Sequence, residues 1–255
     1  MSAAFLTGKW KKLIMANYSV DPEILQPYVP HGTKLNFWRG QCYVTLTGFM
    51  FTDMRFLGIQ VPFHSQVPEI NFRFYVVPEQ NGQLERGVVF IKEMVSRPLV
   101  AMAANLLYRE NYSVKPVRYE CEYQNNDQLI SYHVRNNHWN KIQVRAGKDL
   151  IPIKHGSVEE FLSWQLRGYT KINDQRTSQF TLRHPIWNLY PIKSYDIDID
   201  FGQLYGKSFE FLKYENPDSI FIAEGSSVAI MPREAMIPQA LPFEMINQHQ
   251  LSEVR

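Results

Sequence analysis

Short runs in which apolar and polar residues alternate recur along much of the chain. The clearest run covers residues 69–77, and a period of two is the signature of a β-strand with two different faces. One face is wholly apolar and consists of Ile70, Phe72, Phe74 and Val76. The other face carries Glu69, Asn71, Arg73, Tyr75 and Val77. Similar runs, rich in β-branched and aromatic residues, predict strands within 10–20, 35–51, 87–93, 118–123, 129–134, 141–145, 177–182 and 195–199, and a pair of strands around Gly225 within 220–231.

Helix signals interrupt these strands. Asp21 and Pro22 are typical of a helix start, and Pro27 ends that helix. Further helices are predicted over residues 97–107, 157–169 and 201–211, the second of them opened by the capping box Ser157-Val-Glu-Glu160. About ten strands and three or four short helices predict a mainly β (α+β) fold, an antiparallel curled sheet or β-barrel with inserted helices.

No repeat or linker divides the 255 residues. We therefore expect one domain over residues 1–255, with residues 232–255 as a peripheral tail. The Asn81-Gly82 pair predicts a hairpin turn within this domain.

The charge balance argues against a polyanionic partner. The chain has 27 Lys plus Arg against 25 Asp plus Glu, a formal net charge of +2, so we expect neither nucleic acid nor membrane binding. The most apolar stretch, residues 94–108, contains Arg97 and Pro98 and is shorter than the roughly 20 residues of a membrane span. Two cysteines without metal-type spacing and a start unlike a signal peptide predict a cytoplasmic protein. A homo-oligomer is compatible with exposed strand edges.

Familiar catalytic motifs are missing from the sequence. It contains no phosphate-binding loop, dinucleotide fingerprint or nucleophile elbow. The seven histidines are scattered, and His133 and His138 lie five residues apart across a predicted turn, which is poor spacing for a metal pair. We expect no metal and no cofactor.

The polar face of residues 69–77 is the most informative cluster. If its apolar face packs against covering elements, the polar face looks either into water or into the interior of a barrel. On a solvent face, a Glu69–Arg73 pair would contribute little. In an interior, the same side chains would form a binding site. The residues alone leave both interpretations open.

Four segments of the chain resemble the YqjF-like family of bacterial proteins, which share the acetoacetate decarboxylase-like fold. The most specific is Glu69-Ile-Asn-Phe-Arg-Phe-Tyr-Val76, which is similar to the family's E-[VI]-N-x-R-x-Y-V signature. The other three are Tyr18 to Gly32, Gly87 to Tyr112, and Gly156 to Tyr169 together with His184-Pro-Ile-Trp-Asn-Leu189. The resemblance implies a β-rich cone or barrel with a buried pocket.

In acetoacetate decarboxylases, a lysine forms a Schiff base with a β-keto acid, and a second lysine lowers its pKa. The resemblance places this pair at about Asn111 and Tyr112, and neither can form a Schiff base. Two other lysines are candidate catalytic residues. Lys115 follows shortly afterwards, and Lys92 alternates with Ile91 and so is expected to point inward. Each could instead be a solvated lysine.

The resemblance also places Glu69 where the decarboxylases have a pocket glutamate. Beside Arg73 it is expected to stay ionised, because an opposite charge lowers the pKa of a carboxyl. Arg73 could bind a ligand carboxylate in a bidentate manner. His184 and Trp187 would line the pocket mouth or form a packed corner. The candidate substrate-binding residues are Glu69, Asn71, Arg73, Tyr75, Tyr112 and His184.

Three functions follow from these observations. The first is a small-molecule-binding protein with a cavity for a carboxylate or carbonyl ligand. The second is a lyase, related to decarboxylases, aldolases or hydratases, that acts on a keto acid through Lys92 or Lys115. The third is a structural or interaction protein whose interior is only a packed core. The identity of the ligand is not encoded in any recognisable motif.

Overall fold

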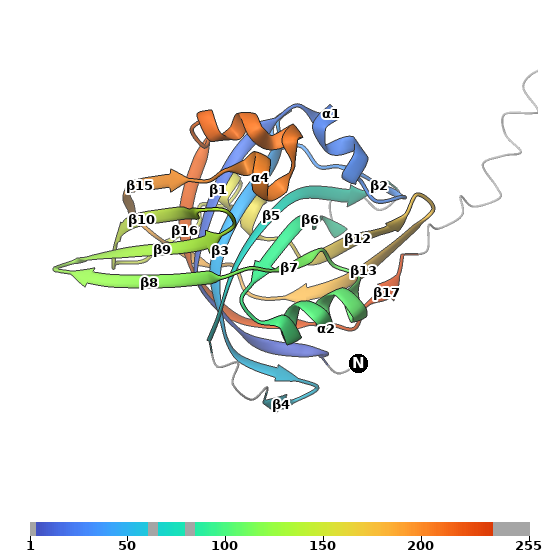
Figure 1. Ribbon diagram of the computed structural model, residues 1–255, viewed down its shortest axis with the longest axis horizontal. Coiled ribbons are helices and arrows are strands. Elements are labelled where there is room, and N and C mark those ends of the chain that lie inside the picture. Colours follow the sequence, from blue (N-terminus) through green and yellow to red (C-terminus); the bar gives the residue numbers. More distant parts are fainter. Residues whose placement is uncertain (1–3, 61–65, 80–84, 237–255) are drawn as a thin grey trace, which may run out of the picture.

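The computed structural model describes residues 4–60, 66–79 and 85–236, and most of them lie in β-strands (Figure 1). The predicted Asn81-Gly82 turn and residues 237–255 of the predicted tail lie outside these ranges. The strands are β1 (Leu6–Val20), β2 (Thr33–Leu35), β3 (Cys42–Phe56), β4 (Ile59–Gln60), β5 (Gln66–Pro78), β6 (Gly87–Val95), β7 (Tyr112–Val114), β8 (Val117–Gln124), β9 (Asp127–Arg135), β10 (Trp139–Gly147), β11 (Ile151–Pro152), β12 (Arg167–Asn173), β13 (Arg176–Arg183), β14 (Asn188–Tyr190), β15 (Ile192–Asp198), β16 (Ser219–Ile230) and β17 (Glu234–Ala235).

The helices are short and lie between the strands. They are α1 (Pro22–Leu25), η1 (Gln26–Tyr28), α2 (Pro98–Tyr108), α3 (Val158–Ser163), α4 (Phe201–Tyr205) and η3 (Lys207–Tyr214), where η denotes a 3₁₀ helix. The predicted N-caps are present. The Asp21 carboxylate accepts a hydrogen bond from the Glu23 N–H, and the Ser157 hydroxyl accepts one from the Glu160 N–H. The predicted helix over 201–211 is divided at Gly206, which has a φ of 114°.

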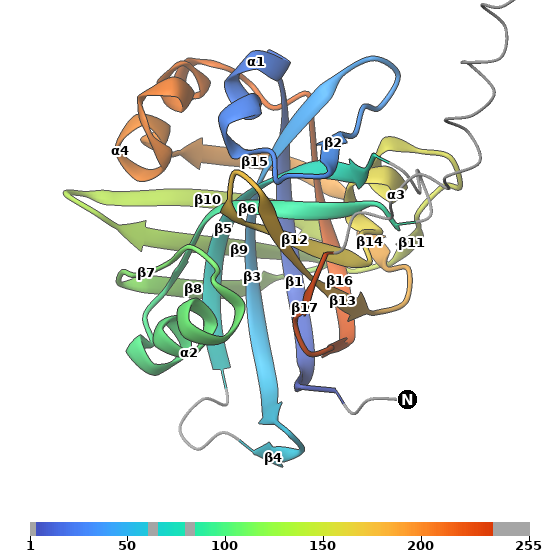
Figure 2. The ribbon, with the colours of Figure 1, turned by 90° about the vertical axis from the view of Figure 1, so that its right-hand side faces the viewer.

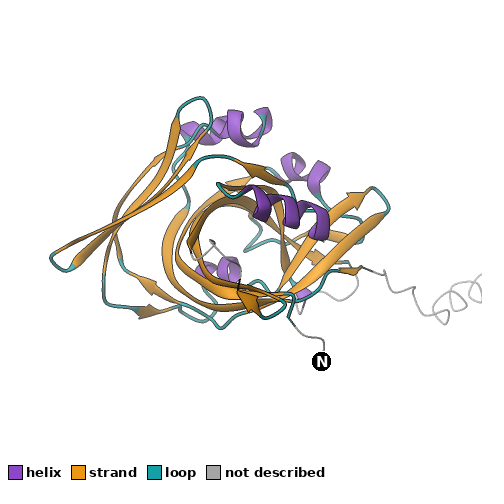
Figure 3. Ribbon diagram, turned by 60° about the horizontal axis from the view of Figure 1, so that its bottom comes forward, coloured by secondary structure: helices purple, strands orange, loops and turns teal. Residues whose placement is uncertain are grey.

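The main sheet closes on itself. Its strands pair in the order β16–β1–β3–β5–β6–β12–β13, and β13 pairs again with β16 (Figure 3). The pairings are antiparallel apart from those of β6 with β12 and with β7, which are parallel. The mainly β, curled-sheet fold predicted from the alternation is confirmed, and the two parallel pairings make the sheet mixed.

One strand prediction and one helix prediction need correction. Residues 219–230 form the single strand β16 and not two strands around Gly225. Gly225, with a φ of 87°, lies opposite an irregularity of β1, and a Cβ at this position would be 2.0 Å from the Trp10 carbonyl oxygen. The glycine therefore allows a close backbone approach inside a strand. Residues 157–169 are helical only to Ser163, because Arg167 onwards pairs in the sheet as β12.

The strand β5 separates two packed layers. Ile70, Phe72, Phe74 and Val76 belong to a core outside the ring, beneath α4, η3 and the second sheet β15–β10–β9–β8. Phe72, for example, packs against Phe209 of η3 with ring centroids 5.1 Å apart. The opposite face of β5 looks into the ring, so the predicted division of this strand into two faces is confirmed.

The second sheet lies very close to the ring at Gly48. A Cβ on Gly48 would come within 2.6 Å of the Tyr132 ring, so this position of β3 has no room for a side chain. The Tyr132 hydroxyl donates to the Lys12 carbonyl oxygen at 3.0 Å. A residue of the second sheet thus holds an irregular part of β1 in place.

Candidate functional site

A cavity of about 500 Å³ lies inside the ring, beside α2. Its wall is mainly apolar and includes Phe49, Phe51, Phe90, Leu107 and Phe180. Its polar residues gather on β5, β6 and the segment that follows α2: they are Glu69, Asn71, Arg73, Glu93, Glu110 and Tyr112. The interior interpretation of the β5 polar face is therefore the one that the structure supports.

Three carboxyl groups share this polar end, and we call Glu69, Glu93 and Glu110 the carboxyl cluster. The Tyr112 hydroxyl donates to Glu69 Oε2 at 3.1 Å and also interacts with Glu93. Glu69 Oε1 accepts from the Asn71 amide at 3.2 Å. Glu110 Oε1 accepts from Thr170 Oγ1 of β12 at 2.7 Å.

The backbone around α2 fixes two of these groups. Arg109 ends α2 in the left-handed conformation, with a φ of 60°, and turns the chain back towards the sheet. The Asn105 side chain then holds Tyr112 through two backbone hydrogen bonds of 2.8 and 2.9 Å. Asn111 lies between the cavity residues Glu110 and Tyr112 but is not part of the described cavity wall. Its side-chain amide donates to the Ile91 carbonyl oxygen at 2.7 Å.

Burial shifts the protonation of the carboxyl cluster. Desolvation raises the pKa of Glu69 to about 7, although Asn71, Tyr112 and the charge of Arg73 act in the opposite direction. Desolvation likewise raises the pKa of Glu110 to about 8, against the hydrogen bond from Thr170. Desolvation and the charges of Glu110 and Glu69 raise the pKa of Glu93 well above its usual value. Arg73 lowers the pKa of Glu69 as predicted, but loss of hydration outweighs this one charge, so Glu69 is not held fully ionised at neutral pH.

Arg73 is buried without a carboxylate partner. Its side chain belongs to a residue that is 7% exposed. Its Nη2 contacts the Met15 sulfur at 3.8 Å, and its Nε has no hydrogen-bond acceptor among the described residues. None of the ion pairs between described residues includes Arg73. A buried guanidinium in this state is costly unless another group brings a compensating charge.

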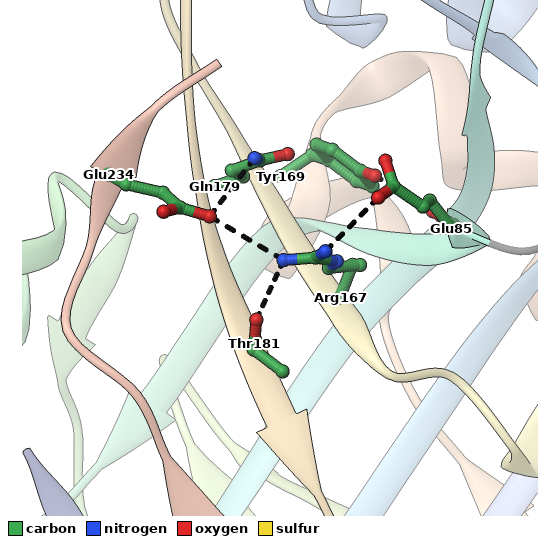
Figure 4. A network of polar contacts seen from close by, with 6 residues as sticks. All are labelled: Glu85, Arg167, Tyr169, Gln179, Thr181 and Glu234. Carbon is green, nitrogen blue, oxygen red and sulfur yellow. Dashed lines mark hydrogen bonds and ion pairs between the residues drawn. The ribbon is translucent and has the colours of Figure 1, made fainter. Parts of the chain in front are cut away.

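Arg167 shows how the same protein satisfies another guanidinium (Figure 4). Its nitrogens lie 3.2 Å from Glu85 Oε1 and 3.5 Å from Glu234 Oε1, and Nη1 donates to Thr181 Oγ1 at 2.7 Å. Arg167 has no place in the cavity wall as the structure describes it. The contrast marks Arg73 as an arginine with unused binding capacity.

The structure places the two predicted catalytic lysines outside the cavity. Lys92 Nζ donates to the Leu204 carbonyl oxygen of α4 at 2.8 Å, and Lys115 Nζ to Asn136 Oδ1 at 2.9 Å. Burial and the nearby charge of Lys115 lower the pKa of Lys92. The inward orientation predicted for Lys92 is wrong because Ile91 is an extra residue in the pairing of β5 with β6. This bulge puts Glu93, and not Lys92, on the cavity side.

Two predicted substrate-binding residues are also absent from the described cavity wall. Tyr75 lies on the same face of β5 as Arg73, but its hydroxyl is 2.6 Å from Thr45 Oγ1 and its ring is covered. His184 stacks on the buried Trp187 ring at a centroid distance of 4.4 Å, so this element is a packed corner. Burial lowers the pKa of His184, and the charge of Arg73 acts in the same direction.

The cavity wall contains four of the predicted residues, Glu69, Asn71, Arg73 and Tyr112, together with Glu93 and Glu110, which were not predicted. The resemblance could have pointed to Glu110 as a site residue, because it directly precedes Asn111 and Tyr112, the positions at which the decarboxylases have their lysine pair. No signal in the sequence pointed to Glu93, because its orientation depends on the bulge at Ile91.

The ring, the cavity beside α2 and the second sheet define an acetoacetate decarboxylase-like fold. The structure aligns with acetoacetate decarboxylase from Legionella pneumophila at a TM-score of 0.62 and 10% identity, over 92% of this chain and 88% of that one. It aligns equally, with a TM-score of 0.62 and 9% identity, with an acetoacetate decarboxylase-like enzyme from Sphingomonas wittichii, over 92% and 94% of the two chains. The enduracididine biosynthesis enzyme MppR complexed with pyruvate gives a TM-score of 0.62 at 8% identity, over 94% and 93%.

The chain belongs to the DUF2071 family, described as "Uncharacterized conserved protein", whose model matches residues 7–227. It is 27% identical over 104 residues to the uncharacterized protein YqjF of Bacillus subtilis. That match spans 40% of this chain and 41% of the relative's length. The resemblance noted from the four sequence segments is thus confirmed. Within the described ranges, no helix is long and apolar enough to cross a membrane.

Proposed function

We propose that the cavity binds a small molecule with an apolar body and a carboxylate or carbonyl head, and that Arg73 holds the head. The observation that carries this proposal is the unpaired, buried guanidinium of Arg73 at the polar end of an otherwise apolar cavity. A ligand carboxylate would accept its hydrogen bonds and supply the missing charge. A carbonyl oxygen would supply acceptors without the charge.

The size and lining of the cavity fit such a ligand. Sites for small molecules are commonly concave, about 300–1,000 Å³, largely apolar and equipped with a few convergent polar groups. The cavity, at about 500 Å³, lies in this range. Protonated members of the carboxyl cluster and the Tyr112 hydroxyl are hydrogen-bond donors that could share the ligand's oxygen atoms with Arg73. The pyruvate complex of MppR, a protein of the same fold, supports a ligand with an oxo acid head.

Binding in this cavity would proceed without a Schiff base. No lysine contributes to the cavity wall formed by the described residues. Lys92 and Lys115 would have to leave hydrogen bonds outside the ring and cross the sheet to reach it. The neutral amine that Schiff-base formation requires is therefore not supplied by either candidate.

Calorimetric titration with hexanoate, 2-oxohexanoate and 2-hexanone tests the proposal. Arg73→Ala is expected to weaken binding of the two carboxylates by about 10- to 150-fold, because hydrogen bonds to charged groups contribute about 1.5–3 kcal/mol. Arg118→Ala, which removes an exposed arginine on the second sheet, is the matched control and should leave affinity unchanged. Equal affinities of Arg73→Ala and the wild type, with circular dichroism confirming an intact fold, would contradict the proposal.

A second candidate function is favoured by the carboxyl cluster itself. With a pKa of about 7, Glu69 is present at neutral pH both as a base and as an acid. Its ionised form could take a proton from the carbon next to a ligand carbonyl, while neutral Glu93 or Glu110 gives a proton to the carbonyl oxygen. The product is the enol, and the reverse steps restore the ketone. This is a lysine-free alternative to the lyase chemistry predicted through Lys92 or Lys115.

Proton exchange in D₂O measures this second function. NMR should show loss of the C3 proton signal of 2-oxohexanoate in the presence of the wild type, because a deuterated carboxyl returns deuterium to the enol carbon. Glu69→Gln should slow the exchange by at least about 100-fold, the lower end of the range for general acid–base catalysis. The variant should still bind the ligand in the titration. Equal exchange rates for the variant and the wild type would rule out Glu69 as the base.

A further inference from the structure

Helix α2 presents an apolar face to solvent. Its sequence, PLVAMAANLLY, contains no charged residue. Leu99, Met102 and Leu106 are 64%, 54% and 67% exposed. The spacing of three and four residues puts these side chains on one face of the helix. Exposed apolar patches of this kind mark interaction surfaces more often than isolated exposed leucines do.

The hairpin formed by the ends of β3 and β4 continues this apolar surface. Leu57 in its turn is 58% exposed, and Ile59 in β4 is 74% exposed. Figure 2 shows α2 and β4 at the same end of the molecule. Both elements contribute to the cavity wall, α2 through Leu99 and Leu107 and the hairpin through Phe56 and Ile59. The exposed apolar residues around the cavity entrance, which we call the apolar rim, are Phe56, Leu57, Ile59, Leu99, Met102, Leu106 and Leu107.

Basic residues border the apolar rim. Exposed Arg97 and Arg109 flank the two ends of α2. A second hollow, which shares Gln60 with the cavity wall, is lined by Lys9, Arg55 and Arg183 and by the single acid Asp53. Asp53 is paired with Lys9 at 3.0 Å. The surroundings of the rim therefore carry a net positive charge although the whole chain has a formal charge of only +2.

We propose that the apolar rim docks on the surface of a lipid bilayer with anionic headgroups and that the cavity opens towards that bilayer. Exposed leucine, isoleucine and phenylalanine side chains would enter the headgroup region, as the apolar faces of interfacial helices do. The bordering arginines and lysine would lie at the level of the anionic headgroups, whose negative charge attracts basic residues. Such docking needs no membrane-spanning helix.

The charges favour a bilayer over a second copy of this chain. A twofold dimer formed through the rim would bring the same surface of both copies together, so the basic residues around the rim of one copy would lie near those of the other. Arg97, Arg109 and Arg55 of one copy would then approach those of the other, and like charges across an interface oppose association. An anionic surface instead complements both the apolar and the basic parts.

Co-flotation with vesicles tests the proposal. The wild type is expected to float with vesicles of equal parts phosphatidylglycerol and phosphatidylcholine and to bind pure phosphatidylcholine vesicles at least tenfold less tightly. The variant M102E with L106E should lose at least tenfold in affinity for the mixed vesicles. Tyr214→Glu, which replaces an 80% exposed aromatic residue on η3, is the matched control and should bind as the wild type does. Arg97→Gln with Arg109→Gln should reduce the preference for phosphatidylglycerol.

Two outcomes would overturn the proposal. One is that the wild type does not float with the mixed vesicles, or floats equally well after the rim substitutions. The other is a concentration-dependent dimer in analytical ultracentrifugation that M102E with L106E abolishes, which would identify a second copy as the occupant of the rim. Circular dichroism and thermal unfolding confirm that each variant is folded, since all the substituted side chains are exposed.

Discussion

Replacing the carboxyl cluster by glutamines, in the variant Glu69→Gln, Glu93→Gln and Glu110→Gln, is expected to remove much of the pH dependence of stability. In the wild type, the pKa of each carboxyl is higher in the folded protein than in the unfolded chain. The folded state therefore binds more protons between the two pKa values, and the free energy of unfolding falls as the pH rises through this interval. The stabilisation is complete below pH 4.5 and is lost as the pH passes through about 7 for Glu69 and about 8 for Glu110.

The expected change is large. One pKa unit corresponds to about 1.4 kcal/mol, so a rise from 4.5 to about 7 makes Glu69 alone responsible for a loss on the order of 3 kcal/mol. Urea denaturation of the wild type at pH 5 and pH 8 should show this fall, and the glutamine variant should show a much flatter profile. The variant Glu79→Gln, Glu122→Gln and Glu215→Gln removes the same number of carboxyls from exposed positions and serves as the control. A wild type that is equally stable at both pH values would contradict the protonation described for the cluster.

Phe209→Ala is expected to destabilise the protein by about 3–5 kcal/mol, the usual cost of removing a buried phenylalanine from a core. Phe209 is fully buried and packs edge-on against Phe72 of β5. It holds η3 on the outer face of the ring, so its loss leaves a cavity between the helix and the sheet. Denaturant unfolding at a single pH measures the difference.

Phe211→Ala is the matched control, because Phe211 lies in the same helix and is 39% exposed. Its replacement should change the free energy of unfolding by about 0.5 kcal/mol, as surface substitutions commonly do. Similar losses for the two variants would mean that η3 is not held by the Phe209 side chain.

The alternation of residues 69–77 was sufficient to predict β5 and to place its two faces. The prediction worked because the period of a strand is set by the local backbone. Whether the polar face meets water or the interior was left open by the residues, because it depends on the closure of the ring by distant strands. The end of the helix that begins at Ser157 was not predictable in the same way. Arg167 onwards pairs with β13 and β6, and these tertiary hydrogen bonds override the local helix signal.

The composition of the site was only partly predictable, because it depends on contacts between distant segments. Glu69 and Arg73 are close in sequence, so their shared orientation could be inferred. The protonation of Glu69 could not be inferred in this way, because its pKa is raised by desolvation, and this burial comes from the closure of the ring by distant strands. The resemblance already implied that the lysine pair of the decarboxylases is missing, and it left Lys92 and Lys115 only as alternatives. The described cavity wall carries three carboxyls, of which only Glu69 was predicted.

The extra residue at Ile91 has a consequence for how this scaffold can evolve. Upstream of the bulge, Val88 and Phe90 face the ring interior, and uninterrupted alternation would bring Lys92 to the same side. The bulge instead gives that side to Glu93. Deletion of Ile91 would remove the bulge but leave Lys92 opposite Phe72 and Glu93 opposite Asn71, so the carboxylate would stay in the cavity wall. An amine would replace it only if the residues after Phe90 paired one position further along β5, with Lys92 opposite Asn71. On this sheet, two chemistries of opposite charge are separated by a one-residue shift in strand pairing.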